Sequence, residues 1–138
     1  MSAHHSTGTP HHAEGEYEDL LGLWSDLESA LSVLLSRPLQ VQDFAAKVRQ
    51  FDSWMQDLVA HDIDAALYLM FQLAGTSTVG YSASHALVCA SLCQLVAPAQ
   101  VDDEGLVRSL NRAALTMNIA MTQVQDELAL QAGQPTPP

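Results

Sequence analysis

The sequence predicts an all-α protein, a bundle of five to six helices, and three observations support this fold class. Apolar residues recur at steps of three and four through most of the chain, which is the period of one face of an α-helix. No stretch alternates convincingly at the two-residue period of a β-strand. The 138 residues, 48% apolar and 15% charged, are enough for one globular domain with its own core.

The domain is expected to span 16–132, between two tails. Residues 1–15 lack an apolar period, so we expect this segment to be disordered. It contains two pairs of histidines: His4, His5, His11 and His12. Such pairs can hold a divalent ion weakly, but a solvated tail is the simpler interpretation. Residues 133–138 are proline-rich and are also expected to be disordered.

The first helix is predicted over 17–36, where leucines and a tryptophan follow helical spacing and Pro38 ends the pattern. A second helix opens at about 40–43 and fades near His61. Asp62 is then placed to cap a third helix that begins at Ile63. This third segment is apolar on nearly every side, which is typical of a central helix.

A fourth helix is predicted over 82–97, after a glycine-bounded loop at 75–80. Ser82 or Ser84 could cap it, and Pro98 is expected to stop it. Because it has almost no polar face, we expect it to be the most buried helix.

A fifth helix is predicted to begin at Asp102 or Asp103 and to continue to about Gln131. We expect a break between Thr116 and Thr122, because Thr116 and Asn118 have low helix propensity.

The charge balance argues against several classes of partner. The chain has 5 Lys and Arg against 16 Asp and Glu, a formal charge of −11. Binding to nucleic acid or to anionic lipid requires clustered cations, so neither is expected. No secretory leader and no membrane-length apolar run is recognised, so we expect a cytoplasmic protein. Cys89 and Cys93 share one helix face and are expected to be reduced.

His85 is the candidate functional residue, because it lies inside a strongly apolar helix. A buried histidine needs partners for its ring nitrogens, so it is either a hydrogen-bonded core residue or a metal ligand. Cys89 and Cys93 follow at four-residue steps, but the three residues extend over about 12 Å of helix. At most His85 and Cys89 could share one soft ion.

Two segments of the chain, YSASHALVCA at 81–90 and RAALTMNIAM at 112–121, resemble the metal-binding helices of a known family. The family is the HD-domain metal-dependent phosphohydrolases, especially the HD-GYP-like branch. The first segment is similar to the helix that carries the family's first histidine ligand, and the second is similar to the family's next helix, with the pattern AALLHDIGK. The resemblance extends over about 60–132 and implies an HD-like helical fold with a divalent metal site.

The chain departs from the family at the signature dipeptide. Met117 stands where the family has histidine, and Asn118 where it has the metal-bridging aspartate. A neutral thioether and an amide are poor ligands for hard divalent ions, so both positions look like a lost site. The dipeptide His61-Asp62 is present but lies upstream of His85, whereas the family's signature follows its first ligand.

The sequence therefore supports three hypotheses. The first is a degenerate or truncated HD-type domain without catalysis or cofactor, which acts as a regulatory or protein-interaction module. It would form a homodimer or bind a protein through exposed apolar faces of the C-terminal helices. The second is a metal-dependent phosphohydrolase with a non-standard divalent metal site, built from His61, Asp62 and His85, with carboxylates from Glu104 or Asp126. The third is a plain helical bundle without a ligand.

Overall fold

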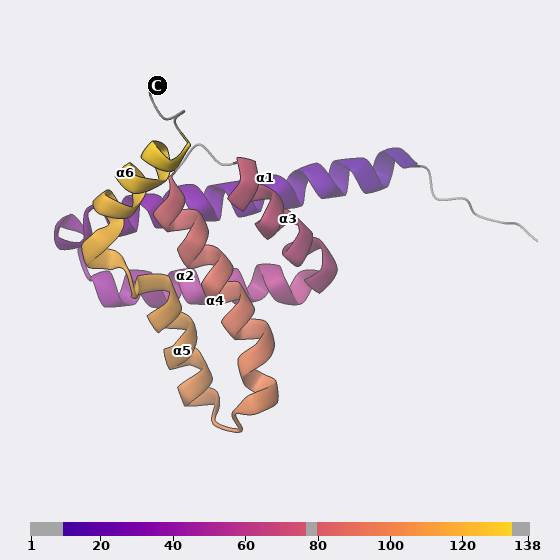
Figure 1. Ribbon diagram of the computed structural model, residues 1–138. Helices are drawn as coiled ribbons and strands as arrows, with labels where there is room; N and C mark the ends of the chain where they lie inside the picture. Colours follow the sequence, from indigo (N-terminus) through magenta and orange to yellow (C-terminus); the bar gives the residue numbers. More distant parts are fainter. Residues whose placement is uncertain (1–9, 77–79, 134–138) are drawn as a thin grey trace, which may run out of the picture.

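The computed structural model describes residues 10–76 and 80–133, with side chains from residue 15 onward (Figure 1). Within these ranges the fold is all-α, as predicted. The helices are α1 (Pro10–Ser36), α2 (Phe44–His61), α3 (Ile63–Thr76), α4 (Tyr81–Gln100), α5 (Glu104–Thr116) and α6 (Thr122–Ala132). Two short 3-10 helices lie between these elements: η1 (Pro38–Gln40) between α1 and α2, and η2 (Ile119–Met121) between α5 and α6. The expected tails lie mostly outside the described residues.

α4 is the central helix of the bundle. α1 and α2 run roughly alongside each other, and α4 crosses them (Figure 1). α4 contacts each of the other five α-helices. Its lower half pairs with α5 to form a helical hairpin that projects beyond α1 and α2 (Figure 1). The prediction of α4 as the most buried helix fits its large buried face, although its outer side is exposed.

The core forms where α1, α2 and α4 meet. Small side chains on the inner face of α4 allow the neighbouring helices to approach closely. Large side chains from the other helices fill the space between them. The fully buried core includes Trp24, Leu27, Leu31, Met55, Leu69, Leu87 and Ala90.

A buried carboxylate joins α2 to α5. Asp52 is 1% exposed, yet its two oxygens are both hydrogen-bonded. Oδ1 accepts from Gln56 Nε2 at 3.0 Å, and Oδ2 pairs with Arg112 Nε at 3.1 Å. A buried charge is stable only when it is paired and hydrogen-bonded, and this arrangement meets both requirements. The ion pair therefore fixes α5 against α2.

The N-terminus of α4 is capped by a residue from α6. Ser82 or Ser84 was expected to cap it, but α4 begins at Tyr81 and no side chain of its own forms the cap. Instead, Asp126 Oδ1 accepts from Ser82 N at 2.8 Å. Gly80 makes this approach possible, because its φ is +133° and a Cβ there would lie 3.1 Å from Asp126 Oδ2.

Three helix predictions are corrected. α1 begins at Pro10 and not near 17, because proline is well suited to a first helical turn. Pro98 does not stop α4, which continues to Gln100. A proline in the last turn removes only one late hydrogen bond, so the helix can finish its turn. α3 is not central, because it lies at the edge of the bundle and leaves Tyr68 and Phe71 exposed.

Other predictions are confirmed. α5 ends at Thr116 and α6 starts at Thr122, so the break lies where it was expected. Asp103 caps α5 by accepting from Gly105 N at 2.9 Å and Leu106 N at 3.2 Å. Asp62 caps α3 through a 3.0 Å bond from Ala65 N. The caps of α3 and α5 could therefore be predicted from the sequence.

Replacement of Asp52 by alanine is expected to lower the free energy of unfolding by about 2 kcal/mol, because it leaves Arg112 and Gln56 without their acceptor. The side chain of Arg112 is 37% exposed and can rehydrate in part, so the loss falls below that of a fully buried pair. Urea unfolding followed by circular dichroism measures the change. Asp57→Ala, an exposed site on the same helix, should change it by less than about 0.5 kcal/mol. Equal effects of the two substitutions would argue against the Asp52 pair as a major contact.

Candidate functional site

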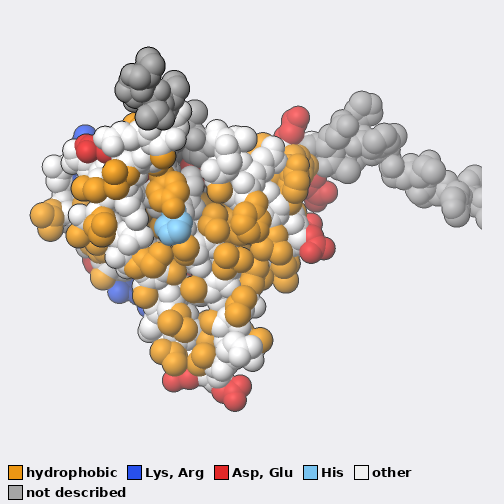
Figure 2. Space-filling view, in the orientation of Figure 1, with side chains coloured by type: hydrophobic (Ala, Val, Ile, Leu, Met, Phe, Trp, Pro, Cys, Tyr) orange, Lys and Arg blue, Asp and Glu red, His pale blue; other side chains and the backbone are white. Residues whose placement is uncertain are grey.

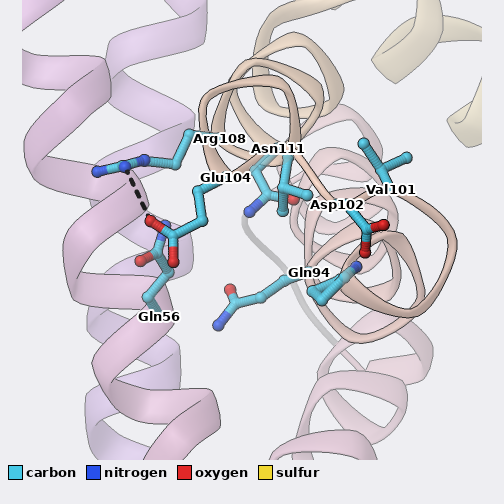
Figure 3. Close-up of a pocket in the computed structure, with 9 residues that line it drawn as sticks. Gln56, Gln94, Val101, Asp102, Glu104, Arg108 and Asn111 are labelled. Atoms are coloured by element: carbon cyan, nitrogen blue, oxygen red, sulfur yellow. Dashed lines mark ion pairs between the residues drawn. The ribbon is translucent and has the colours of Figure 1, made fainter.

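A cleft of about 550 Å³ lies between α2 and the projecting α4–α5 hairpin (Figure 3). Its size falls within the range of small-molecule sites. Carboxamide side chains enter it from three helices: Gln56 from α2, Gln94 from α4 and Asn111 from α5. Apolar side chains complete the wall at the hairpin end: Pro98, Val101 and Val107.

The inner wall of the cleft holds two polar atoms without partners. Asn111 is 1% exposed, and its Oδ1 has no hydrogen-bond partner in the part of the chain that the structure describes. The same is true of Gln94 Oε1. A buried acceptor without a donor costs about 1–3 kcal/mol, so natural proteins usually satisfy such atoms. These two oxygens mark the cleft as a candidate binding site.

Charged side chains lie at the rim. Arg108 pairs with Glu104 at 3.6 Å, and Asp102 lies apart from this pair, beside Val101 in the turn between α4 and α5 (Figure 3). The Arg108 and Glu104 side chains are 54% and 93% exposed, so their pair adds little to stability. The rim therefore carries two carboxylates and one guanidinium, so its net charge is negative.

His85 has contacts on its own helix. Its ring stacks on Tyr81 with centroids 5.3 Å apart and an interplanar angle of 13°. Nδ1 lies 3.5 Å from the Tyr81 hydroxyl, and Nε2 lies 3.6 Å from Cys89 Sγ. Both ring nitrogens thus have a polar neighbour, the arrangement expected of a structural histidine.

The two positions at which the HD resemblance predicts a lost metal site lie just after α5. Met117 and Asn118 line a small pocket together with Ser82 and Ala86 of α4. The structure therefore brings Asn118 against the turn of α4 that contains His85, but His85 is not part of that pocket wall. Among the described residues, no group of three or more His, Cys, Asp and Glu side chains is placed to hold a metal ion.

The alternative ligands have other contacts. Asp62 caps α3, Glu104 pairs with Arg108, and Asp126 caps α4. His61 is exposed at the end of α2. The three acidic candidates thus lie at the N-termini of three different helices.

Cys89 is a poor nucleophile. Burial raises the pKa of its thiol, and the neighbouring Cys93 raises it further. A raised pKa means less thiolate at neutral pH, and the thiolate is the form that reacts and binds metals. The raised pKa therefore does not favour a thiolate at the Cys89–His85 contact.

Sequence reasoning missed the cleft residues, although Asn111 left a signal. It lies between Val107 and Ala114 at steps of four and three, in a register that otherwise holds apolar residues. A polar residue in a core register either has a buried partner or faces a site. Gln94 left a similar signal, because it is a polar residue in a helix that was expected to have almost no polar face.

The comparisons with known proteins give no family. No family model, no curated protein and no solved structure matches the chain. Among the described helices, α4 is long and apolar enough to cross a membrane by length and composition alone, with 39% of that stretch buried. The core helix of a soluble protein meets the same criteria, so this finding decides nothing about location, and the cytoplasmic assignment stays a prediction.

The pH dependence of alkylation tests the environment of Cys89. In a Cys93→Ser variant, the rate with iodoacetamide should rise with pH around a midpoint above the ordinary value of about 8.5, because burial favours the protonated thiol. Unfolding the same variant in urea should return the midpoint to that value. A folded-state midpoint at or below the urea value would contradict the described burial.

Proposed function

We propose that this chain is a non-catalytic helical interaction module that self-associates through the outer faces of α4, α5 and α6. The observation that carries the proposal is a set of exposed apolar side chains on α4, α5 and α6 and the turn between α5 and α6, here termed the apolar face. Its members are Leu92, Val96, Leu106, Leu110, Met117, Met121, Val124 and Leu128. Soluble monomers rarely expose so many large apolar residues on adjacent helices, and such surfaces usually become interfaces.

The orientation of α5 places its apolar stripe outward. Leu106, Leu110 and Met117 follow at steps of four and seven, so they lie on one side of the helix. Arg112 lies on another side, where it pairs with Asp52 of α2. The stripe therefore faces away from α2. Figure 2 shows hydrophobic side chains gathered over this front surface of the molecule, with acidic groups at its edges.

The charge of the chain favours the apolar face as the contact. At −11, two copies repel each other wherever their acidic surfaces meet. None of the eight side chains of the apolar face is charged. A two-fold pair formed there brings the same uncharged patch of each copy together, which is the simplest way to cover it.

The resemblance to HD-domain phosphohydrolases supports the same proposal. In that family, further helices follow the second ligand helix and would cover the surface of α4 and α5. Met117 and Asn118 replace the family's ligand pair, and Met117 is 53% exposed on the apolar face. A position that would bind metal in the family is here part of a hydrophobic surface, which favours interaction over catalysis.

Sedimentation velocity at micromolar concentration tests the self-association. We expect the natural chain to be a dimer and Leu110→Glu to be a monomer, because the glutamates would lie in an apolar interface. The matched control is Leu39→Glu: Leu39 is 100% exposed on η1, outside the apolar face, and its variant should stay dimeric. A monodisperse monomer for the natural chain would overturn the proposal, as would dissociation by Leu39→Glu alone.

Metal analysis tests the absence of a catalytic centre. After replacement of His4, His5, His11 and His12 by alanine and equilibration with Mn²⁺ or Zn²⁺, we expect no stoichiometric ion and no hydrolysis of a phosphodiester, because the family's hard ligands are replaced. His85→Ala should leave the metal content unchanged. A stoichiometric ion that His85→Ala removes would support the metal-dependent phosphohydrolase instead.

A further inference from the structure

The cleft between α2 and the α4–α5 hairpin presents oxygen acceptors from three carboxamides and two carboxylates. The orientation of Gln56 is fixed, because Asp52 can only accept and so takes its Nε2 group at 3.0 Å. The Gln56 oxygen is left for other donors. Gln94 Oε1 and Asn111 Oδ1 are unpartnered among the described residues, and the carboxylates of Asp102 and Glu104 line the same space.

The one charged donor among the described residues that line the cleft lies at the rim. Arg108 lines the cleft, but its guanidinium pairs with Glu104 at 3.6 Å and is 54% exposed. Figure 3 shows its side chain passing above Gln56, while Gln94 extends into the space below. The buried Asn111 oxygen keeps no partner in this arrangement. Among the described residues, no Lys or Arg side chain other than Arg108 lines the cleft.

We propose that this cleft binds a guanidinium group carried on an aliphatic chain, such as that of arginine. A guanidinium is planar, carries five N–H donors and has no acceptor, so it complements carboxamide and carboxylate oxygens that lack donors. Rotation of the Gln94 carboxamide about its side-chain torsions turns its oxygen towards the ligand. The aliphatic chain packs on Pro98, Val101 and Val107.

The charge of the site favours a cation over a neutral ligand. Asp102 and Glu104 contribute two negative charges, and Arg108 returns one positive charge. The ureido group of citrulline has a similar shape but fewer N–H donors, a carbonyl acceptor and no charge, so citrulline should bind more weakly than arginine. An ammonium is a compact point charge that cannot contact several separated oxygens in one plane, so lysine should also bind more weakly.

Side-chain amide signals in ¹⁵N-correlated NMR spectra test the proposal on the full chain. Titration with L-arginine should shift the NH₂ signals of Gln56, Gln94 and Asn111, and citrulline and lysine should shift them at several-fold higher concentration. Gln94→Leu should weaken arginine binding about tenfold, the loss of one charge-assisted hydrogen bond. Asp102→Asn, an exposed substitution, should weaken it about threefold and remove part of its salt dependence.

The matched control is Gln123→Leu on α6, which removes an exposed carboxamide bonded to Glu127 outside the cleft. Its arginine affinity should equal that of the natural chain. A peptide with blocked ends and one arginine separates two sources of the group. Equal binding of peptide and free arginine assigns the cleft to a protein side chain, and binding of free arginine alone assigns it to a small molecule.

Three results would overturn the inference: no shift of the cleft amides with arginine, equal binding of arginine and citrulline, or unchanged affinity in a folded Gln94→Leu protein. The inference does not depend on self-association, because the cleft faces α2 and the apolar face points away from it. A Leu110→Glu monomer should therefore bind arginine as the natural chain does.

Discussion

The rotation of α5 about its own axis depends on one buried carboxylate. Asp52 is enclosed within the fold and must find compensation for its charge, which Arg112 and Gln56 provide. Because Arg112 is tied to α2, the residues beside it on α5 have fixed directions. Asn111 and Leu115 point inward, and Leu110 is left on the outer side. The cleft and the apolar face both follow from this orientation.

α4 provides the second constraint, through small side chains and a remote cap. Ala86 and Ala90 allow α5 to lie close along it, so the pair behaves as one hairpin. Asp126 of α6 caps its first turn at Ser82, where the helix dipole favours a negative charge. The turn at 117–121 is therefore held by contacts on both sides. This arrangement brings Asn118 against α4 without forming a ligand set.

Most of the fold could be predicted from the sequence because its signals are local. Helical periodicity, the caps at Asp62 and Asp103 and the break after Thr116 depend on neighbouring residues. The cap from Asp126 and the Asp52–Arg112 pair join residues far apart in the chain, and no spacing rule indicates them. The cleft was missed for the same reason, since its carboxamides come from three helices. His85 was singled out because it lies in an apolar helix. In the structure its ring nitrogens lie next to the Tyr81 hydroxyl and the Cys89 thiol.

The most direct test of the account asks which atoms meet between two copies of the chain. An isotope-filtered NOE experiment on a mixture of ¹³C-labelled and unlabelled protein detects contacts between copies only. The account predicts NOEs between copies from the methyl groups of Leu106, Leu110 and Met117, because these side chains are exposed together on the outer side of α5. NOEs confined to α3, around Tyr68 and Phe71, would contradict it, as would the absence of any NOE between copies.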